Sequence, residues 1–494
     1  MSEKATRGQR QRLTVWNLGA LVLIGIVGLG LRFVGLDTLP LIGDESYYWL
    51  WSRHPDWAYY DNPAGVALMV RGSTGLGGTS PFGVRWLNAL IGAGSVLLTW
   101  LVARRLLSRR AGLFSAAAVA VGAPYLITSR FVYSNALVLF LTLLNLLAFW
   151  RMAREEAGIG EGLAFGVTLA LLFNAKYTAY VYATAVLAAL LLDHRHLLRT
   201  RRLWLATGIG ILGLMPVMVW NASHDWASFR WQLIHLTRGA VPGGNLLARW
   251  HHVWVYLTGP LILLGVASLG RLRTAGERLL TLVALFLLLP VAVSPANSPR
   301  NLSTGLVPLL MLAGTRLPRD LTTWPRQVLA GGLASVLVAG AVFGIGTVAG
   351  LGGPTPLPRS SIVPAIRRDA AGWPALAARL KGSDEPIFAL DYSIAAQIAF
   401  YAERPAYTAW GQYRIWGIPS LEDTTVVALD YLDPEFVTGR LREAFEHVEG
   451  PEHLTFNERG ATKVVYVWHA EGLRWEQETF LRRFDFLTML GEGG

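Results

Sequence analysis

The chain has 494 residues, of which 53% are hydrophobic and only 16% charged, and its mean hydropathy is +0.39. These values exclude an ordinary soluble globular protein, and the length suffices for a membrane part and one further domain. The net charge of +11 does not indicate a nucleic-acid partner, because the basic residues form short clusters between apolar runs. Cysteine is absent, so neither disulfide nor thiolate chemistry is available.

Apolar runs recur from residues 15–34 up to Gly350, each close to the ~20 residues that cross a hydrocarbon core. Lys and Arg clusters between these runs are typical of cytoplasmic loops, and they predict about eleven transmembrane helices with a cytoplasmic N-terminus. The odd number places the C-terminal part outside a cell membrane. The clusters lie within residues 4–12, 104–110, 151–154, 195–202, 271–278 and 316–326.

The first outer segment, residues 37–81, is long and rich in aromatic residues, and we expect it to be folded at the membrane interface. Amphipathic rings suit the lipid headgroup layer, although the same rings can stack on a sugar. The rings in question belong to Tyr47, Tyr48, Trp49, Trp51, Trp57, Tyr59 and Tyr60.

Asp44 and Glu45 follow the first span directly, which places two carboxylates at the outer surface close to the bilayer. Adjacent acids can divide their work, one acting as a general base while the other holds a hydrogen-bond network or a metal. Alternatively, both acids serve only to cap a helix that begins at Ser46, where negative charge is favourable. The local sequence leaves both interpretations open.

Four basic residues break the positive-inside pattern on the same side: Arg85, Arg130, Lys176 and Arg300. Ionisable groups at membrane depth are functional hypotheses by default, and the alternative is that they reach lipid headgroups. A cleft that collects acids and cations would suit an anionic lipid substrate. Fixed positive charges could also receive the charge of a departing phosphate.

The tail differs from the rest in its charge and turn content and predicts a soluble α/β domain. We expect residues 1–350 to form the membrane core, including the outer loop 37–81, and residues 351–494 to form an extracytoplasmic domain. The predicted elements are helices at 374–381 and 393–401 and strands at 387–390, 425–429 and 463–468.

At this point several segments, in order, resemble the C-type polytopic membrane glycosyltransferases, in the subgroup of protein O-mannosyltransferases and the lipid A aminoarabinose transferase. The first is GDESYYWLWSRHPDWAYYDNPAGVALMVRGSTGLGG with the following Phe82 to Arg85. The others are Lys176-Tyr177-Thr178, Pro216 to Asn221, His224-Asp225-Trp226, Ser228-Phe229 and Ala396 to Tyr401. The resemblance covers most of the chain but does not specify a substrate.

The resemblance implies an inverting transferase that moves a sugar from a polyprenyl-phosphate donor to a lipid, glycan or protein acceptor outside the membrane. Asp44 matches the catalytic acidic position of the family, which implies a role as general base or as activator of the acceptor, with Glu45 supporting it. Further substrate-binding candidates are Tyr60, Asp61 and Tyr177 in the matching segments, and Arg85, Lys176 and Arg300 for the carrier phosphate.

Two departures from the family pattern concern the site. The family often has Asp-His-Pro-Pro where this chain has Asp61-Asn62-Pro63-Ala64, so no role of that His is carried over. The fourth span often begins Pro-Asp, whereas this chain has Ser134-Asn135. Asn135 can orient a hydroxyl or a phosphate by hydrogen bonds but cannot take a proton. It is equally a neutral residue at a helix end.

No cofactor is predicted with certainty. Asp44, Glu45 and Asp61 leave a divalent metal open, but their spacing matches no metal-binding motif. The alternative function is a transporter or flippase of lipid-linked sugars, although repeated halves and broken helices, which are typical of transporters, are not evident. A scaffold protein would explain the tail but not the acids and cations of the outer side.

Overall fold

Long helices form where the sequence is apolar, because in a hydrocarbon environment a helix satisfies its backbone polar groups internally. The computed structural model describes residues 3–237, 265–266, 272–293, 302–317, 322–352, 362–382, 385–485 and 488–489. Within these ranges the chain divides into two units. The first comprises residues 1–34, 61–69 and 85–348, and the second comprises residues 35–60, 70–84 and 349–494.

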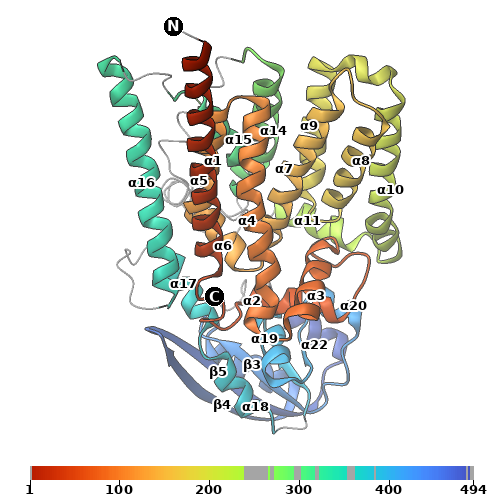
Figure 1. Ribbon diagram of the computed structural model, residues 1–494. Coiled ribbons are helices and arrows are strands. Elements are labelled where there is room, and N and C mark those ends of the chain that lie inside the picture. Colours follow the sequence, from red (N-terminus) through yellow and green to blue (C-terminus); the bar gives the residue numbers. More distant parts are fainter. Residues whose placement is uncertain are drawn as a thin grey trace. The chain divides into compact units, whose positions relative to one another are not determined.

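The first unit is helical. Its helices are α1 (Glu3–Phe33), α4 (Pro81–Leu106), α5 (Arg109–Val121), α6 (Ala123–Arg130), α7 (Ser134–Met152), α8 (Ile159–Phe173), α9 (Thr178–Asp193), η1 (Arg195–Arg199), α10 (Arg201–Ser223), α11 (Ala227–Thr237), α14 (Ala275–Val293), α15 (Ser303–Gly314) and α16 (Trp324–Gly352). Helix α8 packs between α7 and α10 (Figure 1). Arg278 at the start of α14 donates to the Asp193 carboxylate at the end of α9 at 2.9 Å.

Among the described residues, four helices are long and apolar enough to cross a membrane: α4, α7, α10 and α16, the last of them over residues 330–351. Helices α5 and α6 would add a fifth span if they form one span that bends by 57°. The predicted number of about eleven stays a prediction, because several of the apolar runs lie outside the described residues. The predicted end of the last span near Gly350 agrees with the end of α16 at Gly352.

The bend between α5 and α6 follows from its sequence. Gly122 ends α5 in an extended conformation, and Pro124, in the first turn of α6, has no N–H to continue the first helix. At the other end of α6, the side-chain amide of Asn88 donates to the carbonyls of Thr128, Ser129 and Phe131 at 2.9–3.1 Å. Asn88 thereby satisfies carbonyls that the end of α6 leaves without helical partners.

Two buried arginines connect α1 to this bend. The Arg32 guanidinium donates to the carbonyls of Val119 and Ala120 at the end of α5, at 3.0 and 3.1 Å. Arg130 donates to the carbonyl of Leu31 at 2.8 Å. Both cations therefore meet backbone acceptors inside the unit, as buried charges require.

The second unit combines short helices with a mixed sheet. Its helices are α2 (Gly43–Arg53), the greater part of α3 (Gly65–Gly77), α17 (Ile362–Ala370), α18 (Trp373–Leu380), α19 (Tyr392–Ala402), α20 (Gly411–Trp416), α21 (Pro434–Ala444) and α22 (Gln477–Arg483). The strands are β1 (Ile387–Ala389), β2 (Ala406–Tyr407), β3 (Thr424–Leu429), β4 (Phe445–Glu458) and β5 (Ala461–Leu473). Their order is β2-β1-β3-β5-β4, with β1 parallel to β2 and β3, and β5 antiparallel to β3 and β4 (Figure 1).

All five elements predicted for the tail are present, with bounds that differ by a few residues. Strand β4 was not predicted. Its sequence FEHVEGPEHLTFNE lacks a regular apolar alternation because β4 is an edge strand, and most of its side chains are exposed. The strand forms because it pairs antiparallel with β5, from Phe445–Leu473 to Glu458–Ala461, and not because its own sequence is hydrophobic.

A buried lysine joins the sheet to the helices of the second unit. Lys463 on β5 lies 3.8 Å from the ring centroid of Trp373, and its ammonium donates to the backbone carbonyl of Asp369 at 2.6 Å. Burial lowers the pKa of Lys463 to about 7, although the charge of Asp369 opposes this shift. The lysine is therefore held in a place that favours its neutral form.

We expect Asn88→Ala to lower the free energy of unfolding by about 1–3 kcal/mol, because three buried carbonyls lose their donor. Asn88→Asp should cost more, since a carboxylate brings only acceptors against those carbonyls. Thermal unfolding of the purified protein would measure both. Asn457→Ala, at an exposed position of β4, is the control with little effect, and equal melting temperatures for all variants would contradict the role of Asn88.

The second prediction concerns pH. The pKa of Lys463 is about 7 in the folded state and 10.5 in its ordinary state, so between these values the unfolded chain binds more protons than the folded chain. Stability therefore rises with pH over this interval. The melting temperature of the wild type should rise from pH 7 to pH 9 relative to that of Lys463→Met. Lys381→Met, at an exposed position, should show the same dependence of melting temperature on pH as the wild type. The same dependence in Lys463→Met would contradict the lowered pKa of Lys463.

Candidate functional site

Asp44 and Glu45 lie in the first turn of α2, which begins at Gly43 rather than at Ser46. The Glu45 carboxylate is fully buried and accepts a hydrogen bond from the backbone N–H of Ile42 at 3.0 Å. It satisfies an N–H at the start of the helix, which is the capping role that the sequence left open for both acids. The structure assigns this role to Glu45.

Asp44 has a different environment. Its side chain is half-buried, and its Oδ1 accepts a hydrogen bond from the hydroxyl of Tyr392 at 3.0 Å. Tyr392 is the first residue of α19, in the tail. The carboxylate of Asp44 therefore has a hydrogen-bond donor from a distant part of the sequence.

Two further acids of the second unit lie near Asp44, and the sequence analysis missed both. Asp369 accepts from the backbone N–H of Gly43 at 3.4 Å, and Asp391 caps α19 by accepting from the N–H of Ser393 at 2.6 Å. Displacement of water by surrounding protein, and then the charge of Asp44, raise the pKa of both acids, that of Asp369 to about 6.

Only the capping signal of Asp391 could have been found in the sequence, because Asp is a preferred residue before a helix. The stretch Leu390-Asp391-Tyr392-Ser393 precedes a helix that was predicted correctly from position 393. Asp369 ends a helix that the sequence analysis did not predict, so nothing local distinguished it.

The aromatic residues of the first outer segment are packed against protein to a greater extent than predicted. Tyr47, Trp51 and Tyr59 are at most 2% exposed, and the rings of Trp51 and Tyr59 stack with centroids 4.4 Å apart. The prediction that they lie in the headgroup layer is wrong for these three residues. Trp57 is exposed. The backbone N–H of Tyr60 donates to Gln412 at 2.7 Å, and the Tyr60 ring packs against Trp410.

In the first unit, the structure brings together two predicted residues. The Lys176 ammonium lies between α8 and α9 and donates to the Asn135 side-chain oxygen at 3.4 Å. Asn135 is buried in the first turn of α7, whereas Lys176 is half-buried. Asn135 is therefore a hydrogen-bond partner of Lys176, and its role toward a substrate stays a prediction.

Tyr177 and Asp61 occupy the same unit. Tyr177 packs against Phe229 with ring centroids 5.5 Å apart, and the charge of Asp61 acts on its hydroxyl. The backbone carbonyl of Asp61 accepts from the side-chain amide of Gln232 in α11 at 2.8 Å. These contacts connect the segment around Asp61 to the turn that carries Lys176.

Arg85 lies in the first unit at the start of α4, where it is buried and its guanidinium is 5.0 Å from the ring centroid of Phe131. Phe131 is also the residue whose carbonyl accepts from Asn88. Arg300 lies outside the described residues. Its predicted role stays a prediction.

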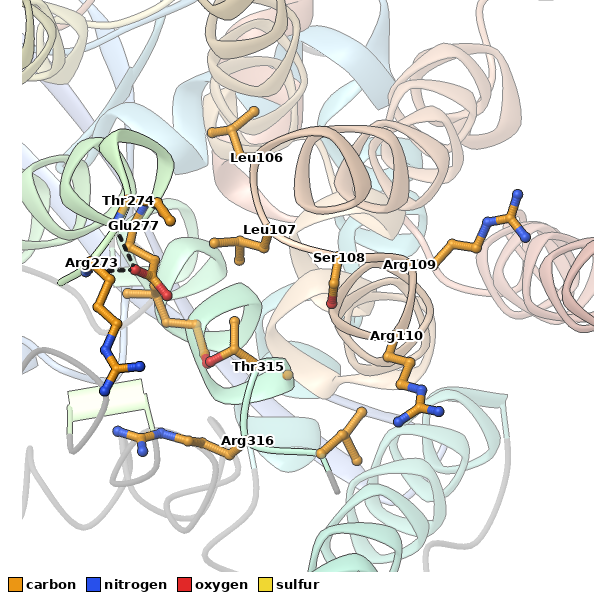
Figure 2. Close-up of a pocket in the computed structure, with 13 residues that line it drawn as sticks. Leu106, Leu107, Ser108, Arg109, Arg110, Arg273, Thr274, Glu277, Thr315 and Arg316 are labelled. Carbon is orange, nitrogen blue, oxygen red and sulfur yellow. Dashed lines mark hydrogen bonds between the residues drawn. The ribbon is translucent and has the colours of Figure 1, made fainter. Parts of the chain in front are cut away.

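None of the predicted site residues lines a cavity that the first unit contains among its described residues. This cavity, of about 670 Å³, lies in the first unit between the ends of α4 and α15 and the starts of α5 and α14. Figure 2 shows its arginines, with Arg273 and Arg316 on one side and Arg109 on the other. They belong to clusters that the sequence predicts to be cytoplasmic. Within the described ranges, no three His, Cys, Asp or Glu side chains are arranged to hold a metal ion.

Comparison with known proteins connects these residues to a family. Residues 61–220 match the family described as dolichyl-phosphate-mannose-protein mannosyltransferase. A lipid A galacturonosyltransferase, RgtD of Rhizobium johnstonii, is 25% identical over 213 residues, which are 43% of this chain and 45% of that protein. The chain therefore matches less than half the length of this curated relative.

The fold is similar to that of solved membrane glycosyltransferases. ArnT from Cupriavidus metallidurans in its apo state has a TM-score of 0.62 at 15% identity, covering 91% of this chain and 98% of ArnT. The same protein bound to undecaprenyl phosphate has a TM-score of 0.61. The oligosaccharyltransferase AglB from Archaeoglobus fulgidus has a TM-score of 0.54 at 12% identity, covering 80% of this chain and 64% of AglB.

These matches confirm the resemblance that the outer loop and the later segments indicated. The family match covers residues 61–220, whereas the fold similarity covers 91% of the chain. The chain has the fold of these C-type membrane glycosyltransferases and is similar to polytopic membrane glycosyltransferases over part of its sequence.

Proposed function

We propose that this protein is a membrane glycosyltransferase that moves a sugar from a polyprenyl-phosphate donor to a lipid, glycan or protein acceptor on the extracytoplasmic side. The matching family is named for a dolichyl-phosphate-linked sugar donor, and a curated relative is named for transfer to lipid A. A solved protein of similar fold binds undecaprenyl phosphate. The cytoplasmic N-terminus and the extracytoplasmic tail, residues 351–494, are parts of the same proposal.

The observation that carries this proposal is the division between the two acids at the start of α2. Glu45 is used by the backbone of its own helix, whereas Asp44 is half-buried and held by a phenol. A half-buried carboxylate with a fixed orientation has the properties of a general base. We therefore assign Asp44 as the base and Glu45 as the residue that shapes the helix start.

The reaction that we propose is a single displacement at the anomeric carbon of the sugar. An acceptor oxygen bonds to this carbon as the bond to the phosphate oxygen breaks, and the configuration inverts. The acceptor proton passes to Asp44, and the polyprenyl phosphate leaves with the electron pair of the broken bond. The leaving phosphate needs no proton where fixed positive charges stabilise it.

We propose Lys176 and Asn135 as the groups that hold the carrier phosphate, because the structure brings a cation and an amide to one place in the first unit. Lysine is a phosphate-binding cation, and the amide of Asn135 can donate to a second oxygen. Arg85, Tyr60, Asp61 and Tyr177 stay candidates for substrate binding. The transfer assay with and without chelator tests whether the reaction needs a divalent metal.

We expect Asp44→Asn to lower the rate of transfer by at least about 100-fold, because an amide cannot accept the acceptor proton. Radiolabelled sugar transfer from synthetic polyprenyl-phosphate donors by the purified protein would measure this, with lipid A as the first acceptor and with and without chelator. Glu45→Gln is the matched control. Its amide oxygen can still accept from the N–H of Ile42, so it should retain most of the activity.

Full activity of Asp44→Asn would contradict the role of Asp44. Absence of turnover by the wild type with every donor and acceptor would instead favour transport of lipid-linked sugars, which vesicles with a labelled lipid would then test. Loss of activity in Glu45→Gln equal to that in Asp44→Asn would show that the two acids do not divide their work as proposed.

A second prediction concerns the donor. Lys176→Met should raise the KM for the polyprenyl-phosphate donor by about tenfold or more, since a charge-assisted hydrogen bond to phosphate is lost. The KM for the acceptor should stay unchanged. The exposed Lys381→Met is the control. An unchanged donor KM in Lys176→Met would remove this lysine from the proposed phosphate site.

A further inference from the structure

Two helix starts meet within the second unit, and both carry acids. Helix α2 begins at Gly43 and α19 begins at Tyr392, with Asp391 as the residue before it. A Cβ atom on Gly43 would overlap the Cβ of Ser393, so the two helix starts approach each other as closely as a glycine permits. The positive ends of both helix dipoles are therefore near the same group of carboxylates.

The carboxylates at this junction have different hydrogen-bond donors. Glu45, Asp369 and Asp391 accept from the backbone N–H groups of Ile42, Gly43 and Ser393. Asp391 also accepts from the hydroxyls of Ser393 and Tyr431. Asp44 accepts from the side chain of Tyr392. The Tyr392 hydroxyl comes from another segment of the chain, and a hydrogen bond to the charged form of a carboxylate orients it and favours that form.

The phenol of Tyr392 is itself held in place. Its ring packs against Tyr47 and Trp410, with centroids 4.7 and 5.0 Å away. Its backbone carbonyl accepts from the hydroxyl of Tyr413 at 3.3 Å. Because the ring is fixed on two sides, the hydroxyl cannot easily leave Asp44.

We propose that Tyr392 is a positioning residue for Asp44, a phenol supplied by the tail that orients the carboxylate and favours its ionised form. The proposal rests on the proposed function, in which Asp44 is the general base. It gives the tail a direct part in the chemistry rather than the role of a cover or an acceptor-binding domain alone.

The electrostatic reason lies in the groups around Asp44. Asp369 on α17 and Asp391 before α19 interact with Asp44 as like charges. The charges of Lys463 on β5 and Asp369 interact, and burial, together with the charge of Asp391, raises the pKa of Tyr413 on α20 and of Tyr431 after β3. On α2 itself, Glu45 adds a further negative charge. A hydrogen bond from a phenol to the ionised carboxylate opposes this repulsion.

The test is the pH profile of transfer. In Tyr392→Phe the ring packing is kept but the hydroxyl is lost, so Asp44 should be harder to ionise. We expect the acid limb of the kcat profile to move to higher pH by about one unit, with an unchanged KM for the donor. Tyr466→Phe is the matched control, because this tyrosine of β5 packs against His453 and Trp468 in the same unit. Its profile should equal that of the wild type.

A second substitution tests the opposite sign. Site-specific fluorotyrosine at position 392 makes the phenol a stronger donor and should move the acid limb to lower pH. A wild-type profile for both variants, or a loss of kcat without movement of the limb, would overturn the positioning role. If Asp44→Asn remains active, the general-base role of Asp44 is wrong, and the role of Tyr392 falls with it. If Asp44→Asn loses activity but the Tyr392 variants behave like the wild type, the proposed function holds and only the positioning role of Tyr392 is wrong.

Discussion

Helix ends inside an apolar unit leave backbone carbonyls that water cannot reach, and the first unit depends on side chains that satisfy them. Arg32, Asn88 and Arg130 each donate to carbonyls at the ends of α5, α6 and α1. Leaving such groups without donors costs more than an ordinary hydrogen bond gains. The bend between α5 and α6 is therefore held by polar residues that look out of place in an apolar sequence.

This bend has consequences for the proposed phosphate site. The chain leaves α6 at Arg130, passes the carbonyl of Phe131 that Asn88 binds, and enters α7 with Asn135 in its first turn. The hydrogen bond between Asn135 and Lys176 then connects this helix start to the turn between α8 and α9. Asn88 thus fixes the end of α6 shortly before the chain enters the helix that carries Asn135.

The second unit follows a different rule, because it concentrates negative charge rather than dispersing it. Four carboxylates lie where α2 and α19 begin, and helix dipoles, backbone N–H groups and the hydroxyls of Tyr392 and Tyr431 offset their repulsion. The pKa of Asp369 is raised and that of the buried Lys463 is lowered, because removal of water disfavours the charged form of each group. Such an arrangement costs stability and is typical of places where a protein carries out chemistry.

The amino-acid sequence by itself determined the membrane class, the tail elements, the ordered family segments and the candidacy of Asp44, Asn135 and Lys176. These are local properties, since hydropathy, periodicity and short motifs depend on neighbouring residues. Only the tertiary structure decided that Glu45 caps α2 and that Asp44 meets Tyr392, a residue 348 positions away. It also decided that Tyr47, Trp51 and Tyr59 are buried and that β4 is a strand. Those outcomes depend on which distant segment supplies the hydrogen-bond donor, the packing surface or the neighbouring strand, and no local pattern records that choice.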